Sequence, residues 1–215
     1  MPPDAPVTMA ILLVSGGHGH FLLPDLPRFR QRYPDIRLHF GEAHQPLDMI
    51  REGFDCIIRA GELSDSPLIK RRLALLERGT FASPDYLGRF GTPQTPDDLA
   101  GHEMVGFLSP DSGDIVPLVF GTDGNAHQLK LPTTVTGPET NVACACLGLG
   151  LIQVPQYRVD AELAHGALVE VLAGFPPSPL PVHVLYSHTR QLSPRLRVFI
   201  DWMAEQFRER LSPTE

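Results

Sequence analysis

The sequence lacks the features that mark membrane and exported proteins. No apolar run approaches the roughly 20 residues of a membrane helix. The first apolar stretch, residues 11–14, follows no basic segment and is too short for a signal peptide. Cysteine is scarce, and its odd number suits a reducing compartment (Cys56, Cys144 and Cys146). We therefore expect a cytoplasmic protein without membrane contact.

Motifs of the common enzyme classes are also missing. The chain contains no GxSxG element, Walker loop, HExxH or CxxC. Ser15 and His18 could suggest a nucleophile and a base, but no third group that would orient the histidine is visible. We expect no catalytic residue and no cofactor.

Metal-binding side chains occur without a complete site. His18 and His20 would offer zinc ligands together with His44, but a polar loop is favoured because a metal site needs a third ligand that can be identified. Cys144 and Cys146 are two positions apart, and on a helix such positions point in different directions. The prediction is that no metal is bound.

Positive charge is sparse. The 18 Lys and Arg residues are scattered among 25 Asp and Glu residues, which leaves a formal net charge of −7. A DNA-binding surface needs a basic cluster that displaces counterions from phosphates. This polypeptide alone is therefore not expected to bind DNA.

What the sequence does contain is an alternation of strand and helix patterns. Apolar or alternating segments predict strands over residues 9–14, 36–40 and 55–58, with helices over 22–32 and 46–52. Such alternation implies parallel pairing and a three-layer α/β architecture. The middle of the chain differs, because it is rich in Gly, Pro and Asp and predicts short strands over 116–120 and 128–131 before a helix over 141–147.

The last helix has the clearest pattern of all. Ser193 is a typical N-cap and Pro194 a typical first helical residue. One apolar stripe then follows at helical spacing (Leu196, Phe199, Ile200, Met203 and Phe207). The stripe predicts a helix whose apolar face packs into a core.

Several motifs together resemble the effector-binding domain of LysR-type transcriptional regulators. The run from Glu52 reads EGFDCIIRAGELSDSPL and is followed by Ala82-Ser83-Pro84-Asp85-Tyr86. Further passages similar to the family, in its order and spacing, are residues 91–102, 147–155 and 192–201. The family's winged helix-turn-helix and linker helix are not among them. A truncated protein, a fragment and a free-standing sensor domain remain open as interpretations.

The resemblance implies a type 2 periplasmic-binding-protein fold, with two three-layer α/β lobes joined by two crossovers. Residues 1–81 with 187–215 would form lobe one, and residues 82–186 lobe two. A small-molecule effector would bind in the cleft between the lobes. The alternative is a periplasmic solute-binding protein, which shares the fold but needs an export signal.

The residues expected to line the cleft come from loops after strands and from lobe two. Ligands in open α/β sheets bind outside the carboxyl ends of the strands, and glycine-rich loops before helices attract anions. The expected ligand-binding residues are Ser15, Gly16, Gly17, His18, Arg59, Gly61, Phe107, Thr140, Gln153 and Pro155. Alternatives are a plain tight turn at residues 15–18, a core position for Phe107, and a salt bridge from Arg59 to Glu62 or Asp65.

The expected partners are an effector, which would be a carboxylate or an aromatic compound, and a second copy of the chain. The resemblance implies a homodimer, or a tetramer of the full-length protein, with DNA bound only through an N-terminal domain missing here. Head-to-tail pairing would use residues 22–32 and 36–40. A basic rim lies around Leu22, Leu26 and Phe29, and Asp160 and Glu162 are candidates to complement it (Arg28, Arg30, Arg32 and Arg37).

Overall fold

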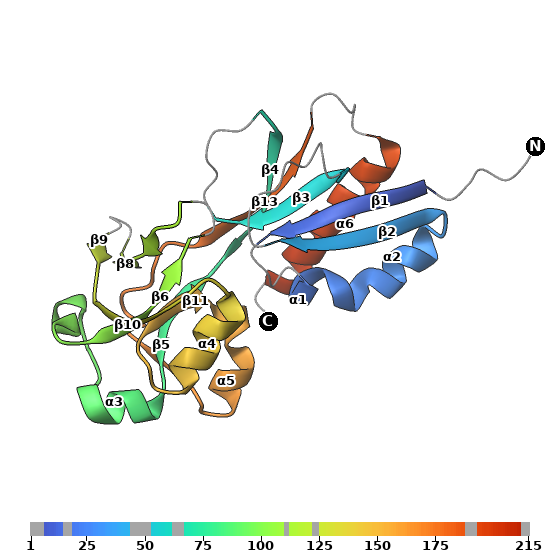
Figure 1. The fold of residues 1–215 in the computed structure, drawn as a ribbon. Helices are drawn as coiled ribbons and strands as arrows, with labels where there is room; N and C mark the ends of the chain where they lie inside the picture. The colour runs from blue at the N-terminus through green and yellow to red at the C-terminus, as the bar shows by residue number, and fades with distance from the viewer. Residues whose placement is uncertain are drawn as a thin grey trace, which may run out of the picture. The chain divides into compact units, whose positions relative to one another are not determined.

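The chain forms two compact units in the computed structural model. The structure describes residues 7–14, 19–43, 53–61, 67–109, 112–121, 125–187 and 193–211. Unit 1 comprises residues 1–75 and 181–215, and unit 2 comprises residues 76–180. The chain therefore passes from unit 1 to unit 2 and later returns, so that unit 1 is discontinuous (Figure 1).

A five-stranded sheet is the centre of unit 1. Its order is β2-β1-β3-β13-β4. The first three members are parallel, and β13 runs antiparallel to β3. This pairing confirms the predicted parallel α/β arrangement (β1, Val7–Val14; β2, Ile36–Ala43; β3, Cys56–Ala60; β4, Ile69–Leu76; β13, Leu180–Tyr186).

The helix predicted over residues 22–32 is divided into three short segments. They are α1 (Gly19–Leu22), the 3-10 turn η1 (Leu23–Asp25) and α2 (Leu26–Arg32). Pro24 and Pro27 each lie in the first turn of a segment. Because proline lacks an N–H and fixes φ, each one begins a segment more easily than it continues a helix. The helix predicted over residues 46–52 lies outside the described residues.

Helix α6 (Pro194–Leu211) closes unit 1 and confirms the predicted cap and stripe. The Leu196 N–H donates to Ser193 Oγ at 3.4 Å. All five residues of the stripe are buried. The ring of Phe207 stacks on Phe21 of α1 with centroids 4.9 Å apart, and Trp202 contacts Phe29 of α2 at 4.9 Å. The return of the chain therefore completes the core on the α1 and α2 side of the sheet (Figure 1).

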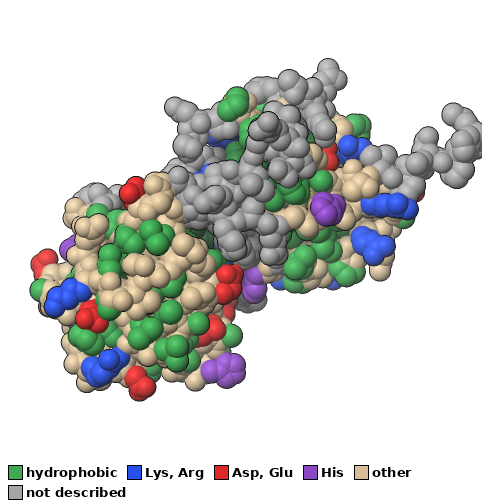
Figure 2. All heavy atoms as spheres, viewed as in Figure 1, with side chains coloured by type: hydrophobic (Ala, Val, Ile, Leu, Met, Phe, Trp, Pro, Cys, Tyr) green, Lys and Arg blue, Asp and Glu red, His purple; other side chains and the backbone are tan. Residues whose placement is uncertain are grey.

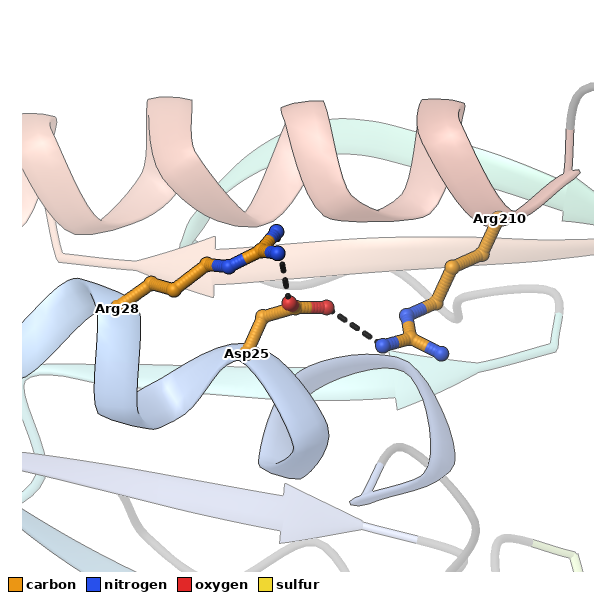
Figure 3. Close-up of polar contacts among 3 residues, drawn as sticks. All are labelled: Asp25, Arg28 and Arg210. Carbon is orange, nitrogen blue, oxygen red and sulfur yellow. Dashed lines mark hydrogen bonds and ion pairs between the residues drawn. The ribbon is translucent and has the colours of Figure 1, made fainter.

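Asp25 joins the first helical region of unit 1 to the end of α6. Its carboxylate pairs with Arg210 at 2.5 Å and with Arg28 at 3.5 Å (Figure 3). Both arginines are substantially exposed. Exposed ion pairs stabilise a fold by about 0–1 kcal/mol, so this contact orients the two segments more than it holds them together.

Asp55 makes the corresponding contact in the interior of unit 1. Its Oδ2 accepts the Ala10 N–H at 2.9 Å, and its own N–H donates to Ala10 O at 2.7 Å. Its Oδ1 lies 3.5 Å from Arg195 Nη2. One buried carboxylate thus connects β1, the entry to β3 and the first turn of α6.

Unit 2 is built from mostly short strands. β5 lies between β11 and β12, β6 lies between β10 and β7, and β8 pairs with β9. A parallel bridge between Met104 and Leu151 connects β6 to the start of β11. The strands are β5 (Arg78–Ala82), β6 (Glu103–Leu108), β7 (Ile115–Val116), β8 (Leu118–Phe120), β9 (Asn125–His127), β10 (Lys130–Val135), β11 (Ile152–Pro155) and β12 (Val169–Val171).

Helices of unit 2 lie at the ends of these strands and against them. The helix predicted over residues 141–147 is α4 (Pro138–Cys146), which begins earlier because Pro138 occupies its first turn. A core cluster that includes Phe81, Val142, Ile152 and Val159 links α4 to β5 and β11. The remaining helices are α3 (Pro84–Phe90), η2 (Pro96–Leu99), η3 (Gln156–Arg158) and α5 (Asp160–Ala164).

The two units divide at residues 75/76 and 180/181, whereas the sequence placed the lobe boundaries at 81/82 and 186/187. Strand pairing accounts for the difference. β5 pairs on both sides with strands of unit 2, and β13 pairs with β3 of unit 1. Such long-range pairing is not visible in local sequence patterns.

We predict that Asp55→Ala lowers the free energy of unfolding by about 1–3 kcal/mol, because the buried Ala10 N–H then loses its acceptor. Asp55→Asn keeps an oxygen acceptor for that N–H and removes the charge that faces Arg195, so it should cost less. Urea unfolding measures both changes, with exposed Asp35→Ala as the control. Equal losses for Asp55→Ala and Asp35→Ala would contradict the prediction.

Candidate functional site

The carboxyl ends of β1 and β3 lie side by side in unit 1. Val14, the last residue of β1, is in register with Arg59 of β3. The expected ligand residues Ser15, Gly16, Gly17 and His18 follow β1 directly, but they lie outside the described residues. The edge at which the sequence predicted a ligand is therefore an edge of parallel strands.

Arg59 lies within the sheet and not in an exposed loop. The residue is 6% exposed and pairs in register with His183 of β13. Burial lowers the pKa of Arg59 from its ordinary value. Glu62 and Asp65, the alternative salt-bridge partners, lie outside the described residues. A buried arginine inside a strand contributes to the sheet, so a substitution there would affect folding as well as any ligand.

Gly61 follows β3 with a positive φ of 110°, a conformation that side chains with a Cβ rarely adopt. Its N–H donates to Pro181 O at 2.9 Å. The backbone conformation at the end of β3 therefore requires a glycine at position 61. The hydrogen bond to Pro181 connects this point to β13, the strand with which the chain returns from unit 2.

The side-chain amide of Gln153 in β11 forms hydrogen bonds to two other strands. Its Nε2 donates to Val119 O at 2.8 Å and to Thr80 Oγ1 at 3.1 Å. Its Oε1 accepts the Val119 N–H at 3.0 Å. Both ends of the amide are thus occupied by β8 and β5, which the sequence could not indicate because these partners are distant in the chain.

Phe107 and Thr140 lie in elements that the structure brings together. Phe107 of β6 is in register with Val135, the last residue of β10 before the turn into α4. Asn141, next to Thr140, donates from Nδ2 to Val105 O of β6 at 3.3 Å. Thr140 is exposed and Phe107 is half-buried. Pro155 is buried at the end of β11, in register with Arg78.

Arg78 is a residue that the sequence analysis did not single out. It is half-buried at the start of β5, and its Nη2 donates to Gln153 Oε1 over a long 3.4 Å. Its buried Nε has no hydrogen-bond partner in the described part of the chain. Burial lowers the pKa of Arg78 from its ordinary value. No local sequence signal distinguishes it from a surface arginine.

The motif residues of unit 2 form a hydrogen-bonded frame. Ser83 Oγ caps α3 by accepting the Tyr86 N–H at 3.2 Å. The fully buried Tyr86 accepts the Glu103 N–H at 2.8 Å through its hydroxyl, which also lies 3.0 Å from His102 Nδ1. Burial raises the pKa of Tyr86 and lowers that of His102, so both side chains are neutral near pH 7. These motifs stabilise the fold of unit 2.

Charged side chains of both signs lie on the surface of the two units. Figure 2 shows Lys and Arg side chains over the part of unit 1 that carries β1, β2 and α2, whereas unit 2 carries Asp and Glu side chains together with some Lys and Arg. Leu22 and Phe29 are buried within unit 1, whereas Leu23 is 52% exposed. Leu22 and Phe29 therefore belong to the core of unit 1, and Leu23 is an exposed apolar residue of the same segment.

The described residues contain neither a candidate metal site nor a candidate membrane-spanning helix. No three His, Cys, Asp or Glu side chains of that part of the chain are grouped so that they could hold a metal ion. His18 and His44 are outside it. No helix among the described elements is long and apolar enough to cross a membrane.

Comparison with known proteins identifies the family. The sequence profile of the LysR substrate binding domain matches residues 8–208, and the chain belongs to this family. The family is a domain of transcriptional regulators and not an enzyme. The fold is accordingly the mixed α/β, periplasmic-binding-protein-like fold of LysR regulatory domains, as predicted.

Individual relatives agree with this assignment. The chain is 38% identical over 194 residues to the uncharacterized HTH-type transcriptional regulator YhjC of Escherichia coli K12, covering 88% of this chain and 64% of that protein. The HTH-type transcriptional regulator CrgA of Neisseria meningitidis serogroup B is 33% identical over 188 residues, with 87% and 62% covered. The chain thus spans less than two thirds of the length of these relatives.

Solved structures show the same fold. The regulatory domain of CrgA from Neisseria meningitidis, described as a LysR-type transcriptional regulator, superposes with a TM-score of 0.78 at 30% sequence identity, covering 94% of this chain and 98% of that one. The effector domain of AmpR from Pseudomonas aeruginosa reaches a TM-score of 0.75 at 21% identity, covering 96% of this chain and 100% of that one. The second likeness supports the fold alone.

We predict that Tyr86→Phe lowers the free energy of unfolding by about 1–3 kcal/mol, because the Glu103 N–H loses the hydroxyl that accepts from it. The matched control is Tyr33→Phe, since the Tyr33 hydroxyl makes no hydrogen bond within the described residues and only its ring is engaged. Chemical denaturation compares the two variants. A loss for Tyr86→Phe no larger than that for Tyr33→Phe would show that the frame depends on ring packing only.

Proposed function

We propose that the chain is the sensory domain of a LysR-type transcriptional regulator, and that a small-molecule effector binds between its two units. The observation that carries the proposal is the combination of a family match over residues 8–208 with a chain that divides into two units linked by two crossings. Relatives that are transcriptional regulators, and about half as long again, support the same assignment.

The unit 1 wall of the proposed site is the edge where β1 and β3 end. It comprises Ser15 to His18 after β1, with Arg59 and Gly61 at the end of β3. Backbone N–H groups in a glycine-rich loop before a helix favour a negative group. Arg59 supports this wall from within the sheet.

The unit 2 wall comprises Phe107 and Thr140, with Gln153 and Pro155 of β11. Phe107 offers an apolar surface and Thr140 an exposed hydroxyl. Because the Gln153 amide already makes hydrogen bonds to β5 and β8, its role on this proposal is to position neighbouring side chains.

In the proposed mechanism, effector binding changes the arrangement of the units and of the subunits. An effector shifts such an equilibrium only if it binds one arrangement more tightly than the other. In the full-length protein, which acts in the cytoplasm, the change would reach DNA through an N-terminal winged helix-turn-helix. The effector itself would be a small carboxylate or aromatic compound.

A thermal-shift screen of small carboxylates and aromatic compounds tests the proposal. We predict that Thr140→Val weakens binding of a compound found in this way by about 2- to 12-fold, the equivalent of one neutral hydrogen bond. The exposed Thr92, which follows α3, provides the matched control as Thr92→Val. Unchanged calorimetric affinity in Thr140→Val would remove α4 from the site, and a screen without any binder would count against the proposal.

We further propose that the chain forms a homodimer, and a tetramer in the full-length protein. The contact surface would be the exposed Leu23 with the basic rim of unit 1, facing acidic residues of a second copy such as Asp160 and Glu162 of α5. The positive charge of the arginines and the negative charge of Asp160 and Glu162 support this pairing. Arg28 already pairs with Asp25 (Figure 3), so Arg30, Arg32 and Arg37 remain to make the contact.

The dimer should bury at least roughly 1,000 Å² in total and persist at low micromolar concentration. We predict that Arg30→Glu combined with Arg37→Glu converts it to monomer, because both exposed side chains would then repel the acidic partner surface. Lys130→Glu, an exposed charge reversal in unit 2, is the control and should leave the dimer intact. Sedimentation velocity decides, and a monomeric parent protein would refute dimerisation by this chain alone.

A further inference from the structure

Arg78 carries a charge that the described protein does not compensate. Its Nη2 has one neutral acceptor, Gln153 Oε1, at 3.4 Å. That oxygen already accepts the Val119 N–H at the shorter distance of 3.0 Å. No Asp or Glu in the described part of the chain forms an ion pair with Arg78, although the chain as a whole has a net charge of −7.

An uncompensated arginine in a half-buried position is costly. Guanidinium stays protonated in proteins, so Arg78 cannot avoid the cost by losing its proton. A buried N–H donor without an acceptor adds a desolvation penalty, and here the Nε lacks one among the described residues. A structural role would be served better by an apolar side chain of similar length.

Neighbouring residues give Arg78 a fixed position. Residues two apart in a strand share a face of the sheet, so Arg78 lies on the same face of β5 as Thr80. Gln153 bonds to both, through Oε1 to Arg78 and Nε2 to Thr80. Gln153 and Pro155, the residues of β11 next to Arg78, belong to the proposed unit 2 wall. Because the Arg78 side chain is only half-buried, a solute can reach it.

We propose that Arg78 is the anion anchor of unit 2 and binds the carboxylate of the effector. The inference rests on the proposed function and deepens it by naming the ligand class as small organic carboxylates. Guanidinium donors match the two oxygens of a carboxylate, and such charge-assisted pairs are about twice as strong as neutral hydrogen bonds. The carboxylate supplies the negative charge that the described protein lacks at this point.

The test is Arg78→Met, which keeps the length of the side chain and removes its charge. In chloride buffer the variant should be as stable as the parent protein or more stable, since an uncompensated charge is gone. Sodium benzoate, sodium succinate and sodium phosphate are then compared with sodium chloride at equal ionic strength. At least one carboxylate should stabilise the parent protein, and Arg78→Met should weaken its binding by about 10- to 100-fold.

Arg158→Met is the matched control, because the Arg158 side chain also belongs to unit 2 and is largely buried, but it pairs with Glu139 at 3.3 Å. It should leave carboxylate binding unchanged. Arg78→Lys retains the charge without the planar fork, so it should bind the carboxylate with intermediate affinity.

Several results would overturn the inference. They are a loss of stability or of folding in Arg78→Met, equal carboxylate binding by Arg78→Met and the parent protein, stabilisation by phosphate alone, and no stabilisation by any of the three anions. If uncharged compounds from the wider screen still bind, the proposed function stands and only the anion anchor fails. If no compound of any class binds, the proposed function fails with it.

Discussion

The fold of unit 1 depends on the return of the chain from unit 2. Residues before the first crossing supply β1, β2, β3 and β4, but the position between β3 and β4 is filled only by β13. Helix α6 then covers the aromatic side chains of α1 and α2. Asp55 connects these early and late segments, because one buried carboxylate accepts from β1 and faces Arg195 of α6. Closing so long a loop costs entropy, which buried contacts of this kind must offset.

In unit 2, the segments are connected by hydrogen bonds of one buried tyrosine and not by a buried carboxylate. Tyr86 joins the start of α3 to β6, and Ser83 fixes the helix start that positions it. The motifs by which the family is recognised in this region therefore build the scaffold. Residues that distinguish one effector from another must be sought among side chains that the scaffold leaves incompletely satisfied, and Arg78 is such a side chain.

Local patterns predicted the elements whose causes are local. The Ser193 cap and the apolar stripe of α6 act within a few turns, and both are observed. The segment over residues 22–32 was predicted as one helix, but Pro24 and Pro27 each lie in the first turn of a separate segment. Assignments that depend on distant partners could not be read from sequence. Arg59 looked like a loop residue until its pairing with β13 placed it in a sheet, and Gln153 looked available until β8 occupied its amide.

Arg78 lies close in sequence to the first crossing between the two units. It is the first residue of β5, and the chain enters unit 2 only shortly before it, after residue 75. A ligand that binds the folded protein and not the unfolded chain stabilises the fold, and the gain rises with the logarithm of one plus the ratio of ligand concentration to Kd. On our proposal, a carboxylate held by Arg78 would therefore stabilise the folded state of unit 2, in which β5 pairs with β11 and β12. On the proposed function, a ligand that also contacted the edge where β1 and β3 end would favour one arrangement of the units over others, and this differential affinity is what regulation requires.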